Sequence, residues 1–294
     1  MEKPKIIAEI GCNHKGEMDI ALEMIKTAAT FCHVDVVKFQ KRNNHELLTE
    51  EEFNAPHPNP YNSYGATYGE HREYLEFSLE QHRQLQSWCN EFGVEYSCSV
   101  WDVTSAKEII SLNPAIIKIP SACNLNQELL TCICDHFDGE IHVSFGMTDR
   151  EEEEKIVSFF EKKGRNKELV IYSCTSGYPV PFEDICLLEL TRLRKTYESR
   201  VKAIGFSGHH LGIAVDAAAV ALGAEWVERH FTLDRTWKGT DHAASLEPDG
   251  LRKLCRDCRA VYKALKYKEE DILEIEKPQL EKLKRNQIRW NDDK

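Results

Sequence analysis

The chain has 294 residues, of which 41% are hydrophobic and 30% are charged, and its formal net charge is −11 at pH 7. This length and composition are typical of a globular protein with a large core. The acidic balance argues against non-specific binding to nucleic acid or to an anionic membrane surface, although a local basic pocket can still hold a small anionic substrate. We therefore expect no nucleic acid and no membrane among the partners.

The beginning of the chain does not resemble a signal peptide, because only a short apolar run precedes Glu9. The longest apolar stretch, 213–224, is interrupted by Asp216 and is too short to span a bilayer. The 11 cysteines are odd in number and scattered, as is typical of reduced thiols. These features predict a cytoplasmic protein.

Short apolar runs rich in β-branched residues alternate along the chain with amphipathic stretches at helical spacing. The expected strands cover residues 5–10, 34–39, 95–100, 115–119, 140–143, 169–173, 201–206 and 225–228. The expected helices cover residues 19–31, 79–92, 104–112, 126–137, 150–163, 182–197, 213–222 and 248–267. Apolar strands separated by helices indicate a parallel sheet covered by helices. The regular repeat of these units predicts an α/β fold closed into a (β/α)8 TIM barrel. A doubly wound open sheet is the alternative, which the lack of a GxGxxG motif after the first strand disfavours.

Two segments depart from this rhythm. Residues 42–78 separate the second strand from its helix and contain a turn-rich, aromatic run at 56–65. A long loop on the strand-end side of a barrel is typical of a lid, and a plain surface excursion is the alternative. Residues 268–294 are highly charged and predict a terminal extension, not a second domain. We therefore expect a catalytic barrel over residues 1–267, with a loop insertion at 42–78 and a charged C-terminal extension at 268–294.

Polar side chains gather at the expected carboxyl ends of the strands, where barrel enzymes place their active sites. Two lysines there, Lys38 and Lys118, are costly to bury unless negative charge accompanies them. Together with nearby hydroxyl groups they predict a cradle for a phosphate or a carboxylate. These hydroxyl groups belong to Ser121, Ser144 and Ser207. Internal ion pairing, for instance of Lys38 with Glu9, is the alternative interpretation.

Two histidines, His209 and His230, follow consecutive strands and form a candidate metal pair. Two imidazoles with oxygen ligands around them suit Mn²⁺, Mg²⁺ or another open-site divalent ion better than a closed zinc site. Glu9 could then act on a metal-bound water or on a substrate hydroxyl. Ser207 and Arg229, which lie beside the histidines in the sequence, could hold an anion. Histidines that only form hydrogen bonds in the core are the alternative.

Several motifs of the chain resemble those of the sialic acid synthase family, in order and at most of the expected strand ends. They are AEIGCNHKG (8–16), VKFQ (37–40), IKIPS (117–121), SFGM (144–147), CTSGYP (174–179), GFSGH (205–209), ERHFT (228–232) and WKGTDHAASLEP (237–248). The resemblance covers nearly the whole chain and concerns the barrel domain. Many members carry a C-terminal antifreeze-like domain that completes the sugar site, and we expect this chain to lack it, with the insertion at 42–78 as the candidate replacement.

The resemblance implies a transferase of nonulosonic acid biosynthesis that forms a carbon–carbon bond between phosphoenolpyruvate and an aldose such as N-acetylmannosamine. The products are a nine-carbon 2-keto sugar acid and phosphate. The resemblance also implies a divalent ion, Mn²⁺ or Mg²⁺, on His209 and His230. It assigns catalysis to Glu9, Lys38, Lys118 and Asp241, the sugar to Glu9 and Asp241, and phosphoenolpyruvate to Lys38, Gln40, Lys118, Ser121, Ser144, Ser176, Tyr178 and Ser207. A homodimer is possible by the same resemblance.

Several alternatives remain open at the level of the sequence. The segment around Ser176 resembles members that accept hexoses phosphorylated at carbon 6, so the acceptor is N-acetylmannosamine, its 6-phosphate or a related aldose. Another phosphoenolpyruvate-dependent condensation, of the Kdo 8-phosphate synthase type, is the nearest enzymatic alternative. A metal-dependent hydrolase and a non-catalytic sugar-binding barrel are the alternatives from other classes.

Overall fold

A computed structural model of the chain describes residues 3–284. The chain divides after Tyr262 into two compact units. The second unit contains the short helix α12 (Lys277–Leu283) within the expected charged extension, of which residues 285–294 lie outside the described part of the chain. None of the helices between residues 3 and 284 has the length and apolar character that crossing a membrane requires.

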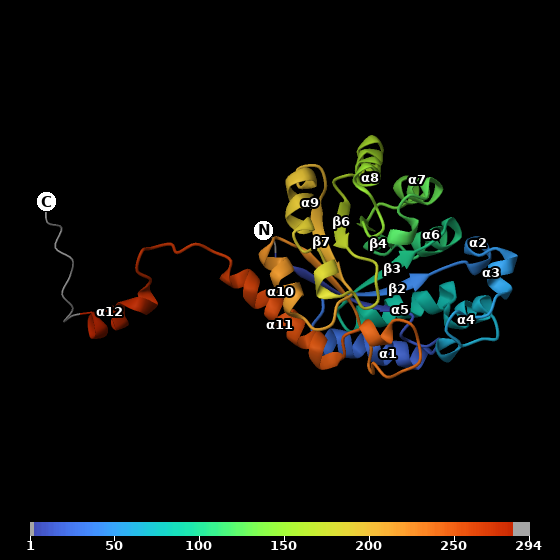
Figure 1. The fold of residues 1–294 in the computed structure, drawn as a ribbon, viewed down its shortest axis with the longest axis horizontal. Coiled ribbons are helices and arrows are strands. Elements are labelled where there is room, and N and C mark those ends of the chain that lie inside the picture. Colours follow the sequence, from blue (N-terminus) through green and yellow to red (C-terminus); the bar gives the residue numbers. More distant parts are fainter. Residues whose placement is uncertain (1–2, 285–294) are drawn as a thin grey trace. The chain divides into compact units, whose positions relative to one another are not determined.

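The first unit is a closed barrel of eight parallel strands that follow one another in sequence order (Figure 1). The strands are β1 (Lys5–Gly11), β2 (Val36–Lys41), β3 (Glu95–Val100), β4 (Ile116–Ile119), β5 (Glu140–Ser144), β6 (Leu169–Cys174), β7 (Ala203–Gly208) and β8 (Trp226–His230). The barrel closes where β1 pairs with β8, with Lys5 opposite Trp226 and Glu9 opposite His230. The predicted TIM barrel is therefore confirmed.

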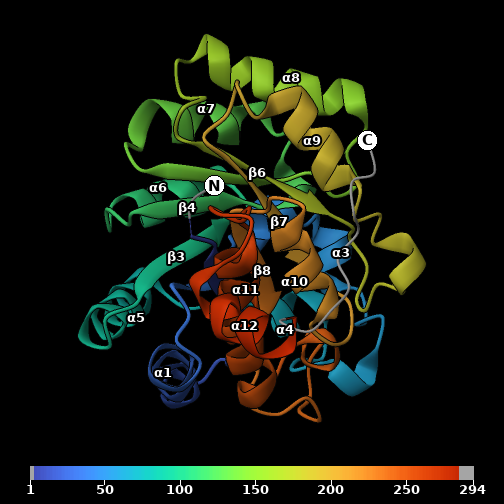
Figure 2. The ribbon, with the colours of Figure 1, turned by 90° about the vertical axis from the view of Figure 1, so that its left-hand side faces the viewer.

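A helix follows each strand and covers the outside of the barrel (Figures 1 and 2). These helices are α1 (Met18–Lys26), α5 (Leu79–Glu91), α6 (Val103–Ile110), α7 (Gln127–His136), α8 (Arg150–Lys162), α9 (Glu189–Tyr197), α10 (Ala214–Ala221) and α11 (Pro248–Ala264). Gly93 and Gly164 lie just past α5 and α8, and both have a positive φ of 69°, which is typical of the residue that ends a helix.

Some element boundaries differ from the expectation. The strands β7 and β8 end two residues later than expected, at Gly208 and His230, because polar residues continue the hydrogen-bonded ladder at the rim of the barrel. The expected helix 182–197 is split, since Cys186 has a positive φ of 51° that an α-helix does not tolerate. The hydrophobic pattern alone predicts neither the later ends of these strands nor the break in the helix.

The insertion 42–78 is not the open loop that we expected, because it forms three short helices that lie together at one side of the barrel (Figure 1). They are α2 (Asn44–Leu47), α3 (Glu50–Asn54) and α4 (Tyr68–Leu75). Thr49 and Thr67 begin α3 and α4 with capping boxes, in which a glutamate three residues later bonds back to the threonine. Both Thr-x-x-Glu patterns are present in the sequence and were available as helix signals.

A buried ion pair joins β8 to α10 and explains where the side chain of Arg229 lies. The guanidinium of Arg229 donates to the carboxylate of Asp216 on α10 at 2.5 Å, and it also donates to the backbone carbonyl oxygen of His210. Successive side chains of a strand point to opposite faces, so Arg229 faces the helices while His230 faces the interior. The expectation that Arg229 holds an anion beside the histidines is therefore wrong.

Removing the carboxylate of Asp216 should destabilise the barrel, because the charge of Arg229 would remain buried without a partner. For Asp216→Ala we expect the free energy of unfolding to fall by about 3–5 kcal/mol, measured by urea denaturation. The control Asp138→Ala changes an exposed carboxylate in a loop and should stay within about 0.5 kcal/mol of the parent protein. Equal midpoints for Asp216→Ala and the parent protein would show that the pair contributes nothing.

Candidate active site

A single cavity of about 400 Å³ lies at the carboxyl ends of the strands, and all of the site residues expected from the sequence line it. Those within strands are Glu9, Lys38, Gln40, Lys118, Ser144, Ser207 and His230. Those that follow a strand are Ser121, Ser176, Tyr178, His209 and Asp241. The structure thus brings together side chains that are separated by more than two hundred residues in the sequence.

Two lysines and two glutamates form a buried charge cluster across the barrel. Lys38 on β2 makes an ion pair with Glu9 on β1, donates to Ser99 at 2.7 Å and lies 3.7 Å from Glu228 on β8. Lys118 on β4 donates to Glu228 at 2.5 Å, and its ammonium group lies 4.4 Å from the centroid of the Tyr172 ring. The internal ion pairing that we considered for Lys38 and Glu9 is therefore present.

The two lysines differ in how well their charge is compensated. Burial lowers the pKa of Lys38, but the negative charges of Glu228 and Glu9 outweigh burial, so the pKa lies above its usual value. Burial also lowers the pKa of Lys118, and there the single partner Glu228 does not fully offset it, so the pKa remains below its usual value. Burial raises the pKa of Glu228, but Lys118 and Lys38 together hold it well below its usual range.

Glu228 is the residue of this cluster that we did not assign a role from the sequence. Its carboxylate accepts hydrogen bonds from Lys118 and from Ser207, at 2.5 and 3.1 Å. The signal that could have found it is the alternation of β8, since Trp226, Glu228 and His230 share one face of that strand. Because His230 was expected to face the interior, the same spacing places Glu228 there.

Two hydroxyl groups converge over the backbone of Gly146, in the loop after β5. The N–H of Gly146 donates to the hydroxyl of Ser121 at 3.0 Å. A Cβ atom added to Gly146 would lie 2.3 Å from the hydroxyl oxygen of Ser176 and 2.7 Å from that of Ser121, so no side chain fits there. The Gly146 N–H is occupied by Ser121, so the two hydroxyl groups are the donors that can form a small cradle for an anion here.

The expected metal pair faces the same cavity. The ring centroids of His209 and His230 are 5.4 Å apart, and the Nδ1 atom of His230 lies 3.8 Å from the carboxylate of Asp241. Burial and the nearby His230 lower the pKa of His209 to about 3, so its imidazole is neutral near pH 7, as a metal ligand requires. His209 uses Nδ1 for a contact of 3.1 Å with the carbonyl oxygen of Thr175, which leaves Nε2 as the free nitrogen.

The donor set around these histidines fits an open site better than a closed one. The buried Nδ1 atom of His230 has no hydrogen-bond partner. Within the described residues 3–284, no group of three or more His, Cys, Asp or Glu side chains is arranged to hold a metal ion. Two imidazoles without a third protein ligand among residues 3–284 suit an ion that takes its other ligands from water or substrate.

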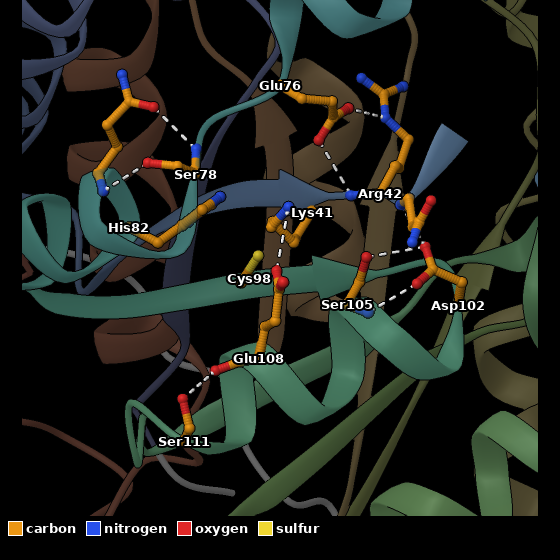
Figure 3. Close-up of polar contacts among 12 residues, drawn as sticks. Lys41, Arg42, Glu76, Ser78, His82, Cys98, Asp102, Ser105, Glu108 and Ser111 are labelled. Carbon is orange, nitrogen blue, oxygen red and sulfur yellow. Dashed lines mark hydrogen bonds and ion pairs between the residues drawn. The ribbon is translucent and has the colours of Figure 1, made fainter. Parts of the chain in front are cut away.

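The insertion forms one wall of the cavity. Its residues there are Arg42, His57, Tyr68, His71, Arg72 and Leu75. Arg42 is held by Glu76, whose carboxylate accepts from both the side chain and the backbone N–H of Arg42 (Figure 3). We expected the segment to approach the site, but its basic side chains were not assigned from the sequence, because the partners of a side chain depend on the local fold.

A model of the NeuB family matches residues 24–270 of the chain. The chain belongs to the NeuB family. The prediction that it is an enzyme of the sialic acid synthase type is confirmed at the level of the family.

Individual relatives in the NeuB family agree with this assignment. The chain is 38% identical over 278 residues to N-acetylneuraminate-9-phosphate synthase of Mus musculus, covering 95% of this chain and 76% of that protein. It is 32% identical over 266 residues to N,N'-diacetyllegionaminic acid synthase of Campylobacter jejuni, covering 90% and 78%. The crystal structure of N-acetylneuraminic acid synthetase from Leptospira borgpetersenii in complex with citrate superposes with a TM-score of 0.81 at 29% identity, covering 97% of this chain and 93% of that one.

A double-mutant cycle tests the buried charge cluster without any substrate. Glu228→Gln leaves Lys118 without its carboxylate, so we expect the free energy of unfolding to fall by about 3–5 kcal/mol. Adding Lys118→Met removes the uncompensated charge and should restore about 1–3 kcal/mol of that loss. Both values come from chemical denaturation near pH 7. Strictly additive effects of the two substitutions would contradict the direct pairing of Lys118 with Glu228.

Proposed function

We propose that this protein condenses phosphoenolpyruvate with an N-acetylhexosamine, namely N-acetylmannosamine, its 6-phosphate or a related aldose. The products are a nine-carbon 2-keto sugar acid and inorganic phosphate. The relatives named above make N-acetylneuraminate 9-phosphate or diacetyllegionaminic acid according to their names. The proposal extends that class of reaction, with its two substrates, to this chain.

One observation carries the proposal: an anion cradle and a pair of histidines line one cavity. The cradle combines Lys38 and Lys118 with the hydroxyls around Gly146. It matches a substrate that carries both a phosphate and a carboxylate. A metal-dependent hydrolase would not need two buried lysines in its active site. A non-catalytic sugar-binding barrel would not need to bury four charged side chains.

The phosphoenolpyruvate would lie over the two lysines, with its phosphate among the strand-end hydroxyls. Its methylene carbon attacks the aldehyde carbon of the open-chain sugar, and the aldehyde oxygen takes up a proton. A positive charge then develops on the carbon of phosphoenolpyruvate that bears the phosphate oxygen. Water adds to this carbon and gives up a proton as the new C–O bond forms. Cleavage of the bond between that carbon and the phosphate oxygen then releases phosphate and leaves the 2-keto group.

The side chains of this site have distinct tasks in that sequence. Lys38 and Lys118 stabilise the charge that builds up on the departing phosphate. Glu9, which Gln40 and Lys38 hold in place, stabilises the positive charge on the phosphoenolpyruvate carbon that bears the phosphate oxygen, or accepts the proton of the water. Asp241, 3.8 Å from His230, lies where the sugar and its aldehyde oxygen would sit and handles the proton there.

His209 and His230 would hold a divalent ion, Mn²⁺ or Mg²⁺, in this site. When bound, such an ion polarises the aldehyde oxygen as a Lewis acid. The chain prepares for it by keeping the imidazole of His209 neutral and by orienting that ring through the carbonyl oxygen of Thr175. Such orientation of a ligating imidazole by a backbone carbonyl is a common second contact of metal sites.

The reaction is tested directly by incubating the protein with Mn²⁺, phosphoenolpyruvate and a panel of acceptors. We expect phosphate release with N-acetylmannosamine or its 6-phosphate, and mass spectrometry should find the sum of the acceptor and pyruvate units in the product. Lys118→Met should lower kcat/KM by at least about tenfold, because a hydrogen bond to a charged group contributes about 1.5–3 kcal/mol. The control Lys107→Met changes an exposed lysine on α6. If phosphate were released with arabinose 5-phosphate only, the proposal would be refuted and an eight-carbon product indicated.

The metal assignment is tested by removing each imidazole. After incubation with Mn²⁺ and gel filtration, we expect the parent protein to retain the metal and His209→Ala and His230→Ala to lose most of it, measured by elemental analysis. The exposed His136→Ala serves as the matched control, and circular dichroism checks that each variant is folded. Full retention of Mn²⁺ by both single variants would exclude these histidines as ligands.

A further inference from the structure

The guanidinium of Arg72 on α4 is buried in the wall of the cavity and forms no ion pair with any residue between 3 and 284. Only 9% of Arg72 is exposed, and its Nε atom is fully buried with no hydrogen-bond acceptor. Burial and the nearby charge of Arg42 lower its pKa, and no ion pair within the described residues offsets that effect. An uncompensated buried cation is costly, so in proteins such a group has a counter-ion or a ligand.

The neighbouring Arg42 does not share this property, although it lies in the same wall. Its guanidinium forms an ion pair with Glu76 (Figure 3). It also donates to the sulfur of Cys12 at 2.8 Å. Burial raises the pKa of the Cys12 thiol to about 12, so this thiol stays neutral and adds no negative charge. Glu76 is hydrogen-bonded to Arg42, and its charge also acts on Arg72, so two guanidinium groups share one carboxylate and one positive charge remains in excess.

Two histidines of the insertion, His57 and His71, add uncharged donors beside Arg72. The Nδ1 atom of His57 accepts from the backbone N–H of Asn59 at 3.0 Å, and that of His71 accepts from the N–H of Tyr64 at 3.1 Å. In a neutral ring, an accepting Nδ1 atom places the proton on Nε2. Burial and neighbouring positive groups lower the pKa of His71 to about 4, so this ring is neutral near pH 7.

These groups form one cluster that contains donors and no acceptor. The ring centroids of His57 and His71 are 4.4 Å apart, and both residues line the cavity together with Arg72. Among residues 3–284, neither Nε2–H group donates to any protein acceptor. A guanidinium and two N–H groups that line one cavity match the terminal oxygens of a phosphate ester.

The helix that carries Arg72 is built as a rigid support. The capping box at Thr67 fixes the start of α4, and Gly69 packs so closely on Phe53 that a Cβ atom would lie 2.3 Å from its ring. The Cζ atom of Arg72 lies 5.6 and 5.9 Å from the ring centroids of Tyr68 and Trp101. The guanidinium is therefore held by packing before any ligand arrives, as expected of a preorganised binding group.

We infer that Arg72, His57 and His71 form an anion subsite that binds a phosphate group on the acceptor sugar. This inference rests on the proposed condensation and specifies its acceptor as a hexosamine phosphate. The anionic groups of phosphoenolpyruvate already have Lys38, Lys118 and the serine hydroxyls, which lie on the strand ends and not on the insertion. A neutral acceptor would leave the charge of Arg72 without a counter-ion, whereas a phosphate on that acceptor supplies it.

The test compares N-acetylmannosamine 6-phosphate with N-acetylmannosamine as acceptors for the intact protein. The parent protein should have the higher kcat/KM for the phosphorylated sugar. In Arg72→Met we expect the ratio of the two kcat/KM values to fall by about 10- to 100-fold, the loss of one charge-assisted contact. Arg72→Lys should restore part of the ratio, and His71→Gln should lower it by a smaller factor. The matched control Arg83→Met changes an exposed arginine on α5.

Calorimetric titration of the two sugars without phosphoenolpyruvate separates this inference from the proposed reaction. We expect the phosphorylated sugar to bind the parent protein and to bind Arg72→Met at least about tenfold more weakly. If Arg72→Met lost binding of the sugar phosphate while the parent protein turned over no acceptor, the subsite would be retained and the condensation rejected. The subsite would be overturned if the ratio of the two kcat/KM values in Arg72→Met stayed within about twofold of the parent value. It would also be overturned if Arg72→Met weakened the binding of phosphoenolpyruvate or inorganic phosphate and not that of the sugar phosphate.

Discussion

The site depends on four charged side chains that meet inside the barrel: Lys38, Lys118, Glu9 and Glu228. Any one of them, buried alone, would destabilise the fold by several kcal/mol, whereas together they carry no net charge. They come from β2, β4, β1 and β8, so they meet only when the sheet closes between its first and last strands. Closure of the barrel and charge balance in the site are therefore one constraint, satisfied by the same residues.

This charge balance also shapes the chemistry that the cavity can support. The carboxylates of Glu228 and Glu9 favour the charged form of Lys38 in a place where burial alone would disfavour it. An incoming anion then shares each ammonium group with a carboxylate, which limits how tightly it is held in the ground state. In the proposed reaction, negative charge builds up on a departing phosphate and the same lysines would interact more strongly with it, which is the differential stabilisation that catalysis requires.

The barrel and its lining could be predicted from the sequence because they depend on short-range patterns. The alternation of apolar strands and amphipathic helices indicates the fold, and in a barrel the strand ends must converge, so His209 and Lys38 share a cavity. The partner of each side chain could not be predicted in the same way. Which carboxylate meets Lys118 depends on register across the barrel, and Arg229 was misplaced because the alternation of β8 was not applied to it. The helices of the insertion were missed because α3 and α4 are short, and their capping signals are weak beside the turn-rich composition.

The cavity has two basic regions, the lysines of the barrel and Arg72 of the insertion, and they differ in how their charge is compensated. The lysines of the barrel are compensated by carboxylates, so they are stable in the empty cavity and suited to charge that changes during a reaction. Arg72 has no such partner, so its charge favours a permanent anion over a neutral group of the same shape. Segments outside the regular elements of a barrel vary more readily than its strands. In the proposed reaction, discrimination between acceptors could then change through the insertion, while the charge cluster that we assign to the chemistry stays intact.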